Sequence, residues 1–196
     1  MILANDTRLQ NVPIMSLHMG GKVATTKRAV INPANLRVYA YEIIGNKSKQ
    51  EFLLTSDIRE FGNLGFIIDN SDHFVSKGDV VKLDHILDTN FNLLGINVKD
   101  TSGRKIGKVS GYTIDTAKFE IQQLSVKQGI LKRITDTGSL IHRNQIVEIS
   151  DDYITVKQAT VSAVDPVMEA PRSTFTNPFR SQPQPSQADS SSTTSP

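Results

Sequence analysis

A glycine-rich segment at residues 103–108, GRKIGK, is the nearest approach in this chain to a known chemical motif. It resembles the loop that cradles phosphates, but that loop has four residues between its glycines and a Ser or Thr after the Lys, where a helix begins. Here three residues separate Gly103 from Gly107, and Val109 follows Lys108. We therefore interpret the segment as a β-turn followed by a glycine kink within a strand.

Polar residues that could serve a catalytic or metal site are scattered along the chain. Ser110 lacks the G-x-S-x-G sequence of a nucleophile elbow, and no pair of histidines has the spacing of a helical metal site. Neighbouring carboxylates lie in turn-like sequence, where Asp side chains stabilise turns. We predict no catalytic, cofactor-binding or metal-binding residue, and we expect that the chain is not an enzyme. The residues considered are His18, His73, His85, His142, Ser110, Asp69, Asp72, Asp151 and Asp152.

Composition and charge are typical of a globular domain with a polar appendage, since 38% of the residues are hydrophobic and 21% are charged. The net charge of +2 gives no strong field that would favour nucleic acid. Cysteine is absent, which excludes disulfides and Cys-based zinc sites and fits a reducing compartment. The first residues lack a signal-peptide pattern, and no apolar run approaches the roughly 20 residues that span a bilayer. We expect a soluble cytoplasmic protein.

The chain matches itself when it is shifted by 83 positions, apolar residue on apolar residue and turn residue on turn residue. A second offset, of 88, aligns the later parts of the two segments. The sequence therefore predicts a duplicated module whose second copy carries five extra residues (88 minus 83) within 127–138. The matched pairs include Gly20 with Gly103, Val23 with Ile106, Ile31 with Ile114, Leu36 with Phe119, Val38 with Ile121, Leu53 with Ile141 and Ile58 with Ile146.

Both copies alternate apolar residues with other residues at the period of a β-strand. On this pattern Leu36 and Val38 should face the interior of a first barrel, and Phe119 and Ile121 the interior of a second. Several short strands at regular spacing favour a small antiparallel barrel for each copy, because closure removes exposed strand edges.

The predicted fold class is all-β, with two tandem small barrels and a disordered C-terminal tail. Residues 79–88, DVVKLDHILD, have apolar residues at helical spacing, with a core strand as the alternative, and residues 1–11 are polar and expected to be loose. The tail is rich in Pro, Ser, Thr and Gln and cannot bury enough apolar surface to offset the entropy of ordering. The expected domains are a first barrel at 12–78, a linker with a short helix at 79–90, a second barrel at 91–160 and the tail at 165–196.

Residues 103–109, GRKIGKV, followed by Ile114, Asp115 and a returning strand, resemble the hallmark of the PRC-barrel family. The resemblance covers about 12–158 in two copies, of which the second is the clearer. The family includes the cytoplasmic domain of the photosynthetic reaction-centre H subunit, the C-terminal domain of a ribosome maturation factor and many small stand-alone proteins. The resemblance implies a small β-barrel used as a binding module, and fold kinship alone does not transfer a specific role. The chain also departs from the ribosome factor at 92–95, where NLLG stands in place of an aromatic–acidic pair.

The extra residues of the second copy form the candidate partner contact. Extra residues in a connection usually run over the surface, where binding groups tend to be carried, and here apolar residues flank two cations. The alternative is a longer strand pair whose apolar residues fill the end of the barrel. The candidate residues are Ile130, Leu131, Lys132, Arg133 and Ile134.

The leading hypothesis from sequence is a non-enzymatic adaptor whose tandem PRC-type barrels bind a protein or a ribonucleoprotein, associated with the ribosome or with RNA processing. The alternative is a structural protein of a membrane surface or envelope, with peripheral membrane contact and the tail as a tether. No cofactor is expected, and neither direct contact with nucleic acid nor an oligomeric state is predicted.

Overall fold

The computed structural model describes residues 3–45, 50–127, 139–150 and 152–158. The chain divides into a unit that ends at Ala159 and a second unit that begins at Thr160, and all described residues belong to the first. The tail predicted at 165–196 therefore lies outside the described residues.

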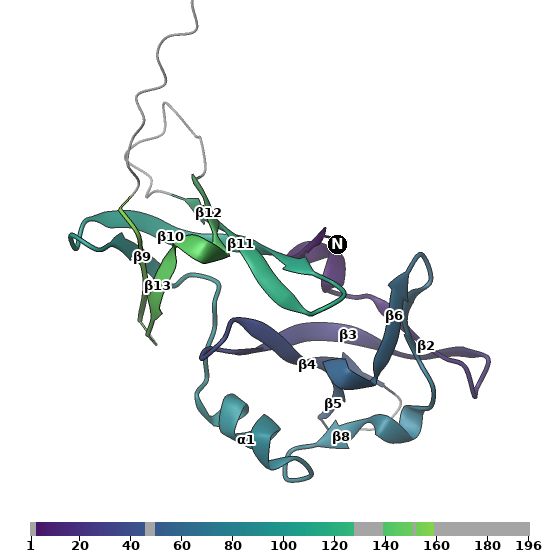
Figure 1. The fold of residues 1–196 in the computed structure, drawn as a ribbon. Coiled ribbons are helices and arrows are strands. Elements are labelled where there is room, and N and C mark those ends of the chain that lie inside the picture. The colour runs from purple at the N-terminus through teal and green to yellow at the C-terminus, as the bar shows by residue number, and fades with distance from the viewer. Residues whose placement is uncertain (1–2, 46–49, 128–138, 151, 159–196) are drawn as a thin grey trace, which may run out of the picture. The chain divides into compact units, whose positions relative to one another are not determined.

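Sheet dominates the described residues, as the sequence predicts (Figure 1). One short α-helix, α1 (Val81–Asp88), lies within the stretch whose apolar spacing indicates a helix. The short 3-10 turns are η1 (Asp6–Leu9), η2 (Thr55–Asp57), η3 (Ser71–His73) and η5 (Arg143–Gln145). The strands are β1 (Leu3–Asn5), β2 (Pro13–Ser16), β3 (Gly21–Asn32), β4 (Arg37–Ile44), β5 (Glu51–Leu54), β6 (Ile58–Gly62), β7 (Gly65–Ile68), β8 (Val75–Ser76), β9 (Asn97–Asp100), β10 (Lys105–Asp115), β11 (Glu120–Lys127), β12 (Ser139–His142), β13 (Ile146–Ile149) and β14 (Tyr153–Val156).

Two groups of strands pair in the same order. In the first strand set, β2–β7, antiparallel pairs join β2 to β3, β3 to β4, β4 to β5 and β6 to β7, and β2 runs parallel to β7. The second strand set, β9–β14, has the corresponding pairs, with β9 parallel to β14. Closed barrels are not confirmed, because within the described residues the sheet path runs from β13 to β6 and no pairing joins its ends.

The turn at the start of the second set forms as the sequence predicts. The Asp100 carboxylate accepts hydrogen bonds from the Ser102 hydroxyl and from the backbone N–H groups of Ser102 and Arg104, both at 3.0 Å. Gly103 adopts φ +85°, a conformation that costs glycine little. A Cβ at Gly107 would lie 2.4 Å from the Lys127 carbonyl oxygen, so this position needs a residue without a side chain. The GRKIGK segment is thus a turn followed by a close approach of β10 to the end of β11 at Gly107.

A short antiparallel contact joins the two strand sets at the starts of β4 and β11, where Arg37 lies opposite Glu120. The Val38 N–H donates to the Phe119 carbonyl at 2.8 Å, and the Ile121 N–H donates to the Leu36 carbonyl at 3.0 Å. The Arg37 Nε lies 3.4 Å from a Glu120 carboxylate oxygen. The preceding residues, Leu36 and Phe119, both have a positive φ, +48° and +53°, and both are buried.

The core is shared between the strand sets. Leu36, Val38, Phe119 and Ile121 are all buried, as predicted. The predicted facing of Phe119 is wrong, however: its ring centroid lies 6.3 Å from that of Tyr41 and 6.0 Å from that of Phe66, which both belong to the first strand set. Periodicity identifies the buried face of a strand but does not say which neighbour supplies the other half of the core. One apolar cluster accordingly contains residues of both sets.

A second, smaller cluster lies under α1, where Leu83 and Ile86 pack against Val30, Ala40 and Phe52. Successive residues of a strand point to opposite faces, so burial of both Val30 and Ile31 means that both faces of β3 are covered here. This doubly covered section of β3 forms one wall of the pocket described below.

The prediction that residues 1–11 are loose is wrong for the described part of that segment. β1 pairs with β10, η1 follows it, and Ala4 and Leu9 are buried. The Asp6 carboxylate accepts a hydrogen bond from the Tyr112 N–H at 3.4 Å. A strand of three residues is too short to show alternation, so its partner could not be found from periodicity.

The shared core makes a direct prediction. Phe119→Ala should lower the free energy of unfolding by about 2–5 kcal/mol, because it leaves a cavity between Tyr41 and Phe66. Gln122→Ala, on the same strand but only partly buried, should change it by less than about 0.5 kcal/mol. Urea unfolding measures both, and equal small effects would contradict this packing.

Tyr41 makes a second prediction, because its hydroxyl is buried without a hydrogen-bond partner among the described residues. Burial, and to a smaller extent Tyr112, raises the pKa of Tyr41 far above its ordinary range, so the hydroxyl stays protonated. Tyr41→Phe keeps the ring and removes the unpaired group, and should raise the free energy of unfolding by about 1 kcal/mol. Tyr39→Phe is the matched change on the same strand and should be nearly neutral; a clear loss of stability in Tyr41→Phe would show that the hydroxyl has a partner.

Candidate functional site: a pocket beside strand β3

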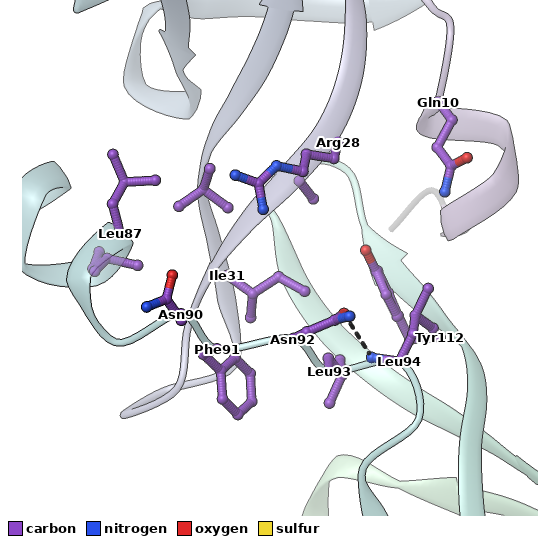
Figure 2. Close-up of a pocket in the computed structure, with 13 residues that line it drawn as sticks. Gln10, Arg28, Ile31, Leu87, Asn90, Phe91, Asn92, Leu93, Leu94 and Tyr112 are labelled. Atoms are coloured by element: carbon purple, nitrogen blue, oxygen red, sulfur yellow. Dashed lines mark hydrogen bonds between the residues drawn. The ribbon is translucent and has the colours of Figure 1, made fainter. Parts of the chain in front are cut away.

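A pocket of about 320 Å³ lies between β3, the connection from α1 to β9, and Tyr112 of β10. Figure 2 shows Arg28 and Ile31 on one side of it and Tyr112 on the other, with Asn92 and Leu93 between them. Ile31, Leu93 and Tyr112 are buried and supply an apolar floor. Leu94, 36% exposed, reaches the surface at the mouth. The pocket therefore combines a buried apolar base with an open entrance.

The rim of the pocket carries neutral amides and one cation, from Gln10, Arg28, Asn90 and Asn92 (Figure 2). Asn90 lies just after α1, has φ +49° and donates its N–H to the Leu87 carbonyl at 3.1 Å. The Asn92 side-chain oxygen accepts a hydrogen bond from the Leu94 N–H at 3.2 Å. Side-chain amides can both donate and accept hydrogen bonds, so this rim can bind ligand groups of either kind.

Glu42 on β4 holds the cations beside the pocket. Its buried carboxylate pairs with Lys27 at 2.7 Å and with the Nε of Arg28, and Arg28 lies opposite Glu42 in the strand register. Burial raises the pKa of Glu42, but the hydrogen bonds and charges of Lys27 and Arg28 outweigh burial, so the net pKa lies below its ordinary value of 4.5. Two cations share one carboxylate, which leaves a net positive charge at this end of the pocket.

Tyr112 offers a hydrogen-bond donor rather than a base. Burial, with a smaller contribution from Asp6, raises the pKa of Tyr112 well above its ordinary value of 10.0, so its hydroxyl remains protonated at neutral pH. The described residues that line the pocket include no Ser, Thr, Lys, His or carboxylate. Nucleophilic attack and acid–base catalysis need such groups, and the arrangement therefore favours binding.

A second pocket, of about 470 Å³, is lined by three cations, Arg37, Lys82 and Lys118, and by no described carboxylate. Arg37 is paired with Glu120, and the Lys82 ammonium lies 5.1 Å from the centroid of the Tyr39 ring. A concave surface with this charge attracts acidic groups at moderate ionic strength.

The residues that the sequence singles out do not form a site together. The candidate contact residues Ile130, Leu131, Lys132, Arg133 and Ile134 lie outside the described residues. His73 lies 3.9 Å from Asp57, whereas His142 contacts Gln123 on another strand pair. Across the described ranges, no group of three His, Asp or Glu side chains could hold a metal ion.

Sequence reasoning missed the pocket beside β3. Its apolar residues look like ordinary core residues, and its amides have no distinctive spacing. One signal was present: at 92–95 NLLG stands where the ribosome maturation factor has an aromatic–acidic pair, and Asn92, Leu93 and Leu94 line the pocket.

No protein-family model matches this chain, and no curated protein matches it. None of the helices in the described part of the chain has the length and apolar character that crossing a bilayer requires.

The Glu42 cluster predicts a pH-dependent stability. Because the folded-state pKa of Glu42 is lowered, its ion pairs stabilise the fold fully above its ordinary pKa of 4.5, and this contribution is lost as the pH falls through the folded-state value. Glu42→Gln should cost about 1 kcal/mol at neutral pH, since both cations are exposed, and progressively less in acid. Urea unfolding at neutral pH and well below pH 4.5 measures this difference, and a cost that does not depend on pH would contradict it.

Proposed function

We propose that this chain is a non-enzymatic binding or adaptor protein that captures a protein or ribonucleoprotein partner in the pocket beside β3. The observation that carries the proposal is the composition of the pocket: a floor of buried apolar side chains, a rim of amides and Arg28, and no described group suited to nucleophilic or acid–base chemistry. Convergent polar groups around an apolar hollow are typical of recognition sites.

We further propose that the chain is a duplicated module of the PRC-barrel type, in which each copy remains open toward the other. The corresponding strand pairings of β2–β7 and β9–β14 support this proposal, as does the resemblance of residues 103–109 to the family hallmark. The exchange of Leu36 and Phe119 across the junction gives a physical reason why the copies need not close separately.

The charges favour a partner with acidic groups. The end of the pocket near Arg28 has two cations on one carboxylate, and the second pocket presents Arg37, Lys82 and Lys118. Ribosomal particles and acidic protein surfaces both meet this requirement, and complementary charge mainly accelerates association and fixes orientation. We propose a cytoplasmic setting for this interaction.

The proposal is tested with a charge placed at the mouth of the pocket. Leu94→Glu should weaken capture of the partner at least tenfold, because it removes apolar contact and places a negative charge where an acidic partner would bind. Val81→Glu is the matched control, since Val81 is 71% exposed and does not line the pocket. The tagged wild-type chain and both variants would be compared by quantitative mass spectrometry of captured proteins and by sedimentation with ribosomes.

A species that is retained by the wild type and by Val81→Glu but lost by Leu94→Glu supports the proposal. Equal capture by both variants would place the binding surface elsewhere. Binding of all three proteins to anionic phospholipid vesicles, without a protein partner, would favour the membrane-surface alternative.

A further inference from the structure

The two strand sets differ at one strand edge. The offset of 83 places residues 30–32 of β3 on residues 113–115 of β10. On β10 both edges of this section are paired: β11 lies along one, and β1 lies along the other, with Leu3 opposite Asp115, Ala4 opposite Ile114 and Asn5 opposite Thr113. The N-terminal segment thus completes the sheet in the second set.

On β3 the corresponding section is paired along one edge. Val30, Ile31 and Asn32 lie opposite Ala40, Val38 and Arg37 of β4, and no strand among the described residues pairs along the other edge. Residues 28–31 all line the pocket, although successive side chains point to opposite faces. Four consecutive residues of a strand can line the same pocket when the edge of the strand, rather than one of its faces, borders that pocket.

The residues that correspond to β1 at the offset of 83 do not form a strand. Adding 83 to 3–5 gives 86–88, and these residues form the last turn of α1. Ile86 packs on Val30 and Ala40, over the face of the sheet, while the following connection through Leu93 forms the far wall of the pocket. Both faces of β3 are therefore covered here, and its edge remains unpaired by any described strand.

We propose that the partner enters this pocket as an added β-strand, antiparallel to β3 at residues 28–32, as β1 adds to β10. This inference rests on the proposed function and names the form of its partner: an extended segment of another protein. An open edge presents backbone donors and acceptors that an extended peptide can satisfy, while side-chain pockets select its sequence.

The position of β1 on β10 predicts the chemistry of that segment. Ala4, opposite Ile114, is buried, so the added strand should carry a small or apolar residue opposite Ile31 that rests on the floor at Leu93. Antiparallel register brings the residue three positions later opposite Arg28. An acidic residue at that position would meet the net positive charge of the Lys27, Arg28 and Glu42 cluster.

The test uses linear seven-residue peptides displayed on phage and selected on the full chain. Enriched peptides would be synthesised with a single backbone N-methyl group at each position in turn. In an antiparallel strand alternate N–H groups point toward the neighbouring strand, so methylation should weaken binding at least tenfold at alternate positions and less than about twofold at those between. Hydrogen exchange at residues 28–32 should slow on binding, while residues 113–115, already paired with β1, should not change.

The outcomes separate this inference from the proposed function. Peptides that lose binding to Leu94→Glu but not to Val81→Glu, and that show the alternating pattern, support both proposals. Loss of binding to Leu94→Glu with uniform tolerance of N-methylation, or without slower exchange at 28–32, would support the pocket as the binding site and overturn strand addition. Failure to enrich any peptide that distinguishes the wild type from Leu94→Glu would count against both.

Discussion

Two backbone hydrogen bonds at the junction of β4 and β11 determine how the rest of this protein can pack. They join Val38 to Phe119 and Ile121 to Leu36, so each strand set holds the first residues of the other's central strand. Leu36 and Phe119 occupy left-handed backbone conformations that are costly for large side chains. Both are buried, and that burial offsets the strain. Leu36 and Phe119, the buried residues just before the junction, therefore belong to one apolar cluster with residues of both strand sets.

The open sheet follows from this exchange. The Phe119 ring packs against Tyr41 and Phe66, and the turn that contains Leu36 borders a hollow together with β13. The first set thus receives the Phe119 ring from the second and need not close on itself. Arg143 reinforces the junction, because its guanidinium donates to the carbonyls of Asn35, Leu36 and Ile121. Removing one set would expose the apolar residues of the other set that it covers.

The predominance of strands could be predicted from the sequence, because turns and period-two alternation are local signals. Val38 and Ile121 were assigned to buried faces on that basis and are buried. Phe119 was assigned to the wrong half of the core, since alternation does not identify the neighbour. β1 was missed because three residues show no period and their partner lies about 110 positions later. The pocket was missed because an unpaired strand edge is a property of the fold and has no residue signature.

The two strand sets differ in how β3 and β10 are paired among the described residues. The offset of 83 places residues 30–32 of β3 on residues 113–115 of β10, and the N-terminal segment pairs with the edge of β10. Its counterpart is helical and buries Ile86 against Val30, which stabilises the face of β3 without satisfying its edge. An unpaired edge on a flat surface would invite aggregation. Here the edge borders a hollow that Leu93, Tyr112 and the amide rim also line, rather than a flat surface.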